Sequence, residues 1–232
     1  MKKLTLFTLA AIFALTATFA ESEKKVVHAI HLAVPIQFET WESTKSIIAS
    51  HVSEKTNNDI TFCGANFAWN KMTANESGFS FLIGMGLGAT VASSGDLKSL
   101  DGQKGFESDL KLGWGFAPIR SENNILAFHG FINLDFKYLD NDKTKTMKEQ
   151  SIELNYITEC FEFKLGIDAV FVHHFSEHFG LFTGLDVSTT VLGYSAVFVS
   201  SDNKSIIDNE SYSFDISGKI NIIPRIGICW II

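Results

Sequence analysis

Apolar and polar residues alternate with a period of two along almost the whole chain. In one segment, for example, Phe79, Phe81 and Ile83 alternate with Ser80 and with Gly84. Because successive side chains of a strand point to opposite faces, this period predicts β-strands with one apolar and one polar face. After the first twenty residues, no segment of any length shows the 3.6-residue period of an amphipathic helix. The pattern therefore predicts an all-β chain.

The alternating segments number eight and differ in how they are connected. They cover residues 30–38, 60–69, 79–89, 110–116, 126–138, 161–171, 181–191 and 212–230. Long polar connections at 40–59, 93–105, 140–151 and 200–211 alternate strictly with short ones at 72–77, 118–124 and 173–178. An even number of antiparallel strands with short turns at one end and long loops at the other is typical of outer-membrane barrels. We therefore predict an eight-stranded antiparallel up-and-down transmembrane β-barrel.

The first twenty residues have the three parts of a secretory signal peptide. Lys2 and Lys3 are basic, residues 4–15 are apolar, and residues 18–20 form a small-x-small cleavage site ending at Ala20. We expect residues 1–20 to be removed and residues 21–232 to form the barrel domain. A cleaved signal together with a barrel predicts the outer membrane of a diderm bacterium.

The distribution of charge between the two strand faces separates a membrane barrel from a soluble one. One face carries large apolar groups, whereas the other mixes glycine with charges of both signs, which can be buried if they pair. The predicted lumen charge network is Glu107, Asp109, Lys111, Asp135, Lys137, Glu162, Lys164, Asp168, Asp186, Lys219 and Arg225. The apolar face would then contact lipid. The alternative is a secreted, soluble, lipocalin-like barrel that binds a small apolar ligand.

Aromatic residues fall near the ends of the predicted strands, as in the two interfacial girdles of membrane barrels. The predicted girdle residues are Trp41, Trp69, Trp114, Phe128, Tyr138, Phe171, Tyr212 and Trp230. Pro224 lies inside the last predicted strand, where it removes a ladder hydrogen bond. We expect a bulge there, or a strand that begins later.

Taken together, the signal peptide, the eight alternating strands and the amphipathic last segment, residues 218–232, resemble the small outer-membrane β-barrels of the OmpA/OmpW-like kind. The last strand of such barrels usually ends in an aromatic residue that the assembly machinery recognises. In this sequence the last aromatic residue, Trp230, is followed by two isoleucines. The resemblance implies a monomer whose partners are outer-membrane lipid, the barrel-assembly machinery at the C-terminal strand, and a host or matrix ligand at the surface loops. It implies a role in envelope integrity, surface interaction or passage of small hydrophobic solutes.

Few residues indicate specific chemistry. His173, His174 and His178 form a weak metal-binding alternative, but they lie in a predicted turn and lack zincin spacing. No nucleophile elbow accompanies His51 in its polar loop, so we expect no enzyme and no cofactor. A formal charge of −7 and a pI near 5.5 give no basis for nucleic-acid binding.

The expected lumen is narrow, because eight strands leave an interior that side chains fill. A carrier of hydrophobic solutes would need an apolar lining near the outer rim. The inward residues that break the polar pattern are Leu82, Phe131, Val170 and Phe182. The three cysteines, Cys63, Cys160 and Cys229, are interpreted as small apolar side chains within strands.

Overall fold

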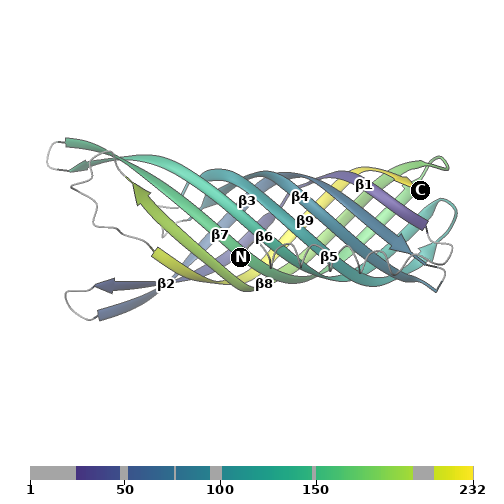
Figure 1. Cartoon of the computed structure of the whole chain (residues 1–232), viewed down its shortest axis with the longest axis horizontal. Coiled ribbons are helices and arrows are strands. Elements are labelled where there is room, and N and C mark those ends of the chain that lie inside the picture. Colours follow the sequence, from purple (N-terminus) through teal and green to yellow (C-terminus); the bar gives the residue numbers. More distant parts are fainter. Residues whose placement is uncertain are drawn as a thin grey trace, which may run out of the picture.

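The fold is a closed, elongated β-barrel (Figure 1). The computed structural model describes residues 25–47, 52–75, 77–94, 101–147, 150–200 and 212–231. The strands are β1 (Lys25–Ala33), β2 (Ile36–Ile47), β3 (Val52–Ala74), β4 (Phe79–Ser93), β5 (Lys104–Arg120), β6 (Asn124–Met147), β7 (Gln150–His174), β8 (Phe179–Ser200) and β9 (Tyr212–Ile231). All pairings are antiparallel. Among the described residues, no helix is long and apolar enough to cross a membrane. The predicted signal peptide, residues 1–20, lies outside the described residues.

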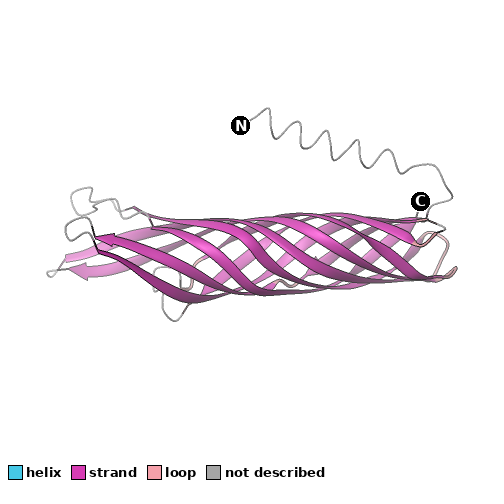
Figure 2. Cartoon of the chain, turned by 90° about the horizontal axis from the view of Figure 1, so that it is seen from below, coloured by secondary structure: helices cyan, strands magenta, loops and turns pink. Residues whose placement is uncertain are grey.

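The predicted eight-stranded up-and-down barrel is confirmed, with one difference in the first strand. β1 and β2 lie end to end between β3 and β9, so the nine segments form a ring of eight. The strands are strongly tilted and wind around the long axis of the barrel (Figure 2). The first strand is interrupted at Pro35, which lacks an N–H group. The Pro35 carbonyl still accepts a hydrogen bond from the Gly64 amide at 3.0 Å, so the wall stays connected.

All three prolines of the chain lie where the sheet is irregular, as prolines within sheets do. Pro224 faces the gap between β1 and β2, and its carbonyl accepts a hydrogen bond from the Val34 amide at 3.1 Å. Pro118 lies in a register shift of β5 between Phe116 and Ile119. β9 therefore continues through Pro224, because the partner strand is interrupted at that point.

Two of the long connections predicted from sequence were wrong. In the 40–59 region, β2 and β3 stay paired as far as Ile47 and Val52, and in the 140–151 region β6 and β7 stay paired as far as Met147 and Gln150. These hairpins project from one end of the barrel (Figure 1). Alternation reports which face is buried, whereas ladder hydrogen bonds continue through segments that are polar on both faces. The predicted connections at 93–105 and 200–211 do match gaps between strands.

The ends of the barrel differ in their connections. The short-turn end has the turns β3–β4, β5–β6 and β7–β8, together with the start of β1 and the end of β9. At the long-loop end lie the two projecting hairpins and the β4–β5 and β8–β9 connections. Gly78, at φ +91°, provides the left-handed backbone of the β3–β4 turn, a conformation that glycine adopts without steric cost.

Candidate functional site

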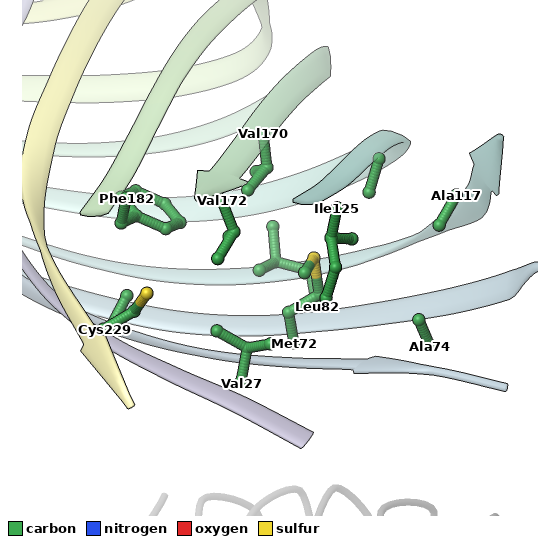
Figure 3. Packing of buried hydrophobic residues seen from close by; sticks show 12 residues of the cluster. Val27, Met72, Ala74, Leu82, Ala117, Ile125, Val170, Val172, Phe182 and Cys229 are labelled. Carbon is green, nitrogen blue, oxygen red and sulfur yellow. The ribbon is translucent and has the colours of Figure 1, made fainter. Parts of the chain in front are cut away.

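The lumen is filled in layers along the barrel axis. At the short-turn end lies an apolar plug, in which side chains from all around the ring point toward one another (Figure 3). The apolar plug consists of Val27, Ala29, Met72, Ala74, Leu82, Ala117, Ile125, Ala127, Val170, Val172, Phe182 and Cys229. Two clusters of buried charges lie farther along the strands from the short turns. The barrel is therefore closed by apolar packing at one level and by ion pairs at two others.

The lower ionic cluster consists of Lys111, Asp168, Asp186 and Arg225 and lies next to the apolar plug. Lys111 pairs with Asp186, while the Arg225 guanidinium pairs with Asp168 and, at 2.7 Å, with Asp186. All four side chains are buried. Aromatic rings flank the cations: Lys111 Nζ lies 4.6 Å from the ring centre of Phe131. Such pairing is what makes buried charges tolerable in a low-dielectric interior.

The upper ionic cluster is a closed set of two lysines and two carboxylates: Asp135, Lys137, Glu162 and Lys164. Lys137 Nζ lies 2.8 Å from Asp135 and 2.7 Å from Glu162. Lys164 Nζ lies 2.8 Å from Glu162 and also pairs with Asp135. Because each lysine bridges both carboxylates, removing any one member leaves a buried charge without its full complement.

The remaining residues of the predicted charge network have different surroundings. Gln37 donates a hydrogen bond to buried Glu107 at 3.1 Å, and Asn133 donates to half-buried Asp109 at 3.2 Å. Lys219 lies in β9, but its side chain is outside the described part of the structure. The structure thus brings eight of the predicted charged residues into the two ionic clusters and leaves two carboxylates hydrogen-bonded to amides.

Sequence reasoning missed several buried polar residues of the lumen. Glu39 is buried in β2, because the first strand runs beyond the predicted end at residue 38. His31, Asn66 and Asn70 occupy inward positions of β1 and β3. With its amide oriented by its neighbours, Asn70 accepts a hydrogen bond from Arg225 Nη1 at 2.8 Å. Inward parity within each strand was the signal that could have identified these residues.

A serine and a histidine meet inside the lumen between the lower ionic cluster and the apolar plug. Ser80 Oγ and His129 Nε2 share a hydrogen bond of 2.8 Å, and His129 pairs across the sheet with Asp168 on the same inward face. All three side chains are buried. Despite the residue types, this geometry presents no nucleophile to a substrate, because the apolar plug closes the lumen on one side and charges fill it on the other.

A small cavity of about 20 Å³ lies beside the lower ionic cluster. Its polar lining includes His31, Asn66, Asn70, Lys111, Asp186 and Arg225. This volume suits a single water molecule with several polar partners. It is far smaller than a drug-sized ligand pocket.

The predicted carrier lining was placed at the wrong end of the barrel. Leu82, Val170 and Phe182 do face the lumen, but they belong to the apolar plug at the short-turn end. Phe131 is buried against Lys111 in the middle of the lumen. The prediction that these residues face the lumen was correct. Their level along the barrel axis was predicted wrongly, because strands that neighbour each other run in opposite directions.

The aromatic residues predicted for the girdles face away from the lumen wherever their side chains are described. Six are half-buried or exposed at outward positions: Trp69, Trp114, Phe128, Tyr138, Phe171 and Trp230. Phe106 and Tyr138 stack at 5.7 Å toward the long-loop end. Trp41 and Tyr212 lie in β2 and β9, with side chains outside the described part.

The histidines of the weak metal alternative do not converge. His174 is buried in the lumen, whereas its neighbour His173 is exposed and hydrogen-bonds Asn124 at 2.9 Å. His178 is exposed in the β7–β8 turn. Adjacent residues of a strand face opposite sides, so the first two cannot share one ion. Within the described ranges, no group of three metal-ligating side chains is found.

Comparison with known proteins shows the fold. No family model matches the chain, and no curated protein matches its sequence. The chain is similar to the crystal structure of outer membrane protein OprG from Pseudomonas aeruginosa, with 10% identity, a TM-score of 0.56, and coverage of 91% of this chain and 97% of that chain. Weaker similarity is found to a major outer membrane protein from Thermus thermophilus, with 10% identity, a TM-score of 0.46, and coverage of 88% of this chain and 99% of that chain. Outer membrane protease OmpT from Escherichia coli has 11% identity, a TM-score of 0.44, and coverage of 90% of this chain and 97% of that chain. The likeness to OprG shows that this chain has the fold of an outer-membrane β-barrel.

Proposed function

We propose that this chain, which has the fold of an outer-membrane β-barrel, is a non-enzymatic outer-membrane protein of a diderm bacterium, exported by a cleaved signal peptide. Its lumen is closed, and it acts at the cell surface through the two hairpins β2–β3 and β6–β7. The observation that carries this proposal is that both hairpins continue as paired strands well beyond the apolar outer wall.

The outer wall supports the membrane location. Large apolar side chains remain highly exposed on strands in different parts of the ring, as with Phe67 at 60%, Ile167 at 66% and Leu192 at 70%. A soluble protein rarely leaves so much contiguous apolar surface uncovered. On β6 the apolar outward positions run from residue 126 to 138, about 40 Å along the strand or about 30 Å along the axis at a tilt of about 40°. That height matches the hydrocarbon core of a bilayer.

The interior argues against the alternative of a soluble barrel with a small apolar ligand. Such a barrel needs an apolar lumen with room for the ligand, whereas here the middle of the lumen contains the two ionic clusters. The apolar plug is packed side chain against side chain. The same filling gives no support to passage of solutes along the barrel axis.

The two hairpins provide the contact surface that the proposal requires. Beyond residue 139, β6 and β7 pair for a further eight positions, or about 25 Å at the usual rise per residue. Outward polar residues Asp140 and Glu159 mark the level at which the apolar wall ends. A closed barrel with strands reaching this far is suited to holding a contact surface away from the lipid, toward a host or matrix ligand.

Surface proteolysis and hairpin replacement test the proposal. Intact cells that express the protein are treated with protease, and the fragments are mapped by mass spectrometry. Cleavage within residues 140–157, with the barrel strands protected in the outer membrane, is the expected result. Recovery of the mature chain in a soluble fraction would overturn the membrane location.

Function is then assayed with a variant in which residues 143–154 are replaced by Asn-Gly. Cells with this variant are expected to lose adhesion to surfaces coated with collagen, laminin or fibronectin. A matched control replaces residues 202–209, in the β8–β9 connection, with a Gly/Ser segment of equal length. Adhesion that survives in the hairpin variant, or is absent in the parent, would overturn the surface role. Planar-bilayer recordings of the parent are expected to show no steady open channel.

A further inference from the structure

Three strands form an unusual outward surface where the barrel closes. His28 of β1 pairs across the sheet with Trp230 of β9 on one side and with Lys71 of β3 on the other. The His28 ring stacks on Trp230, with centroids 5.5 Å apart and planes 11° from parallel. It also lies 5.8 Å from the ring of Trp69. The seam between the first and last strands therefore carries a row of aromatic and basic groups. In Figure 1, β1 and the C mark lie at the short-turn end of the barrel.

Lys71 stands out on this wall by its charge. Along the described strands, the outward side chains between the two rims are otherwise uncharged. No described carboxylate lies within ion-pair distance of Lys71, and its outward neighbours two residues away are Trp69 and Thr73. A cation with no described carboxylate beside it, next to interfacial aromatic rings, can bind an anion from its surroundings.

We propose that Lys71, His28, Trp69 and Trp230 form a binding site for the phosphate of an anionic phospholipid. Tryptophan rings settle at the level of lipid headgroups, and this is the level at which an ammonium at the edge of the apolar wall meets phosphate oxygens. Lys71 supplies the positive charge, His28 a ring N–H donor, and the two indoles supply flat apolar walls and N–H donors.

The lipid belongs to the inner leaflet. This assignment rests on the proposed function, in which the hairpins face the outside and the short turns face the periplasm. The phosphate site lies toward the short-turn end, because Lys71 is near the end of β3 and Trp230 is near the end of β9. A lipid held there contacts the first and last strands together and so stabilises the closed ring.

Lipid retention in native mass spectrometry tests the site. Full-length protein is folded in vesicles of phosphatidylethanolamine with about one fifth phosphatidylglycerol, extracted in a mild detergent, and its bound lipids are counted. We expect phosphatidylglycerol to be retained about fivefold above its share in the vesicles, as expected for about 1 kcal/mol from one basic residue at an anionic surface. The combined substitution Lys71→Gln and His28→Gln should abolish this enrichment.

Two further variants keep the result decisive. Lys104→Gln removes an outward lysine at the opposite rim and should leave the enrichment unchanged. Lys71→Arg keeps the positive charge and should preserve the enrichment. This variant keeps the proposal testable even if the combined variant fails to fold. Enrichment that is lost equally in Lys104→Gln, or kept in the combined variant, overturns the proposal. Displacement of the lipid by inorganic phosphate at millimolar concentration would reassign the site to free phosphate and overturn the lipid assignment.

Failure of the lipid site can be told apart from failure of the proposed function. A protein that enters vesicles and shows heat-modifiable mobility on a gel, but retains no excess phosphatidylglycerol, is a membrane barrel without this site. A protein that stays soluble and does not enter vesicles contradicts the membrane location itself.

Discussion

Ser80 Oγ lies 2.8 Å from Nε2 of His129, although strand β5 separates the strands that carry them. The residue between them on β5 is Gly115, which pairs with Ser80 on one side and with His129 on the other. Because glycine has no side chain, the two polar groups can meet across the strand that divides them. The contact gives His129, which is buried, a hydrogen-bond partner that it would otherwise lack on this side.

This geometry predicts that Gly115→Ala destabilises the barrel. A Cβ at this position would meet the Phe128 carbonyl and the His129 Cα, so backbone has to move and the hydrogen bond is lost. We expect a loss of about 1–3 kcal/mol in the free energy of unfolding, measured by urea titration in lipid vesicles. Gly130→Ala is the matched control, because its Cβ would point outward with the nearest atom at 4.0 Å. Equal losses in both variants would contradict the explanation.

Lys137→Gln is predicted to lower the free energy of unfolding more than Gly115→Ala does. This substitution leaves Asp135 and Glu162, both buried, with only Lys164 as a counter-charge. Breaking a buried ion pair in this way costs about 3–5 kcal/mol. Adding Glu162→Gln restores equal numbers of charges and should recover part of the loss, which a double-mutant cycle measures directly. Additive losses would show that the two residues do not interact.

Truncation within the apolar plug should show which face of β8 packs in the lumen. Phe182 is 1% exposed and stacks against His31 at 4.9 Å, so Phe182→Ala opens a cavity and should cost about 3–5 kcal/mol. Leu185 lies three residues later on the outward face, at 46% exposed. Leu185→Ala should cost clearly less, since lipid fills the space that the side chain leaves. The same urea titration compares the two, and the reverse order would contradict the assignment of faces.

The cysteines provide a chemical test of the same two faces. Cys63 is exposed on the outer wall, whereas Cys160 and Cys229 are buried in the lumen. In detergent, a small membrane-permeant maleimide should modify Cys63 alone, and all three thiols should react after unfolding. Mass spectrometry of the intact chain counts the added groups. Rapid modification of Cys160 in the folded protein would mean that the lumen is open.

The period of two was enough to predict the barrel because it reports the quantity that defines this fold: which side of each strand faces the lumen. The inward carboxylates and lysines were predicted in the same way, from their alternation with the apolar residues alone. Their partners could not be identified, because the register between strands decides which charges meet. Lys111, for example, pairs with Asp186, which is three strands away in the ring.

Strand ends were the least predictable feature, for a physical reason. Segments 40–59 and 140–151 are mostly polar in sequence, so the alternation disappears while the backbone ladder continues. The predicted end at residue 38 also hid Glu39 from the list of inward charges. Residues 30–38 were predicted as one strand although Pro35 lies among them, because the alternation of apolar and polar residues continues across the interruption.

Pro35 and Pro224, which both lie at the seam, bear on how the ring closes during folding. Contacts between β9 and the first two strands join residues that are nearly a whole chain apart, so they close the largest loop and are expected to form late. The gap opposite Pro224 divides this last step in two: seven residue pairs zip with β1 and eight with β2. The seam therefore consists of two short ladders, joined at the gap by the hydrogen bond from the Val34 amide to the Pro224 carbonyl, rather than of one continuous ladder.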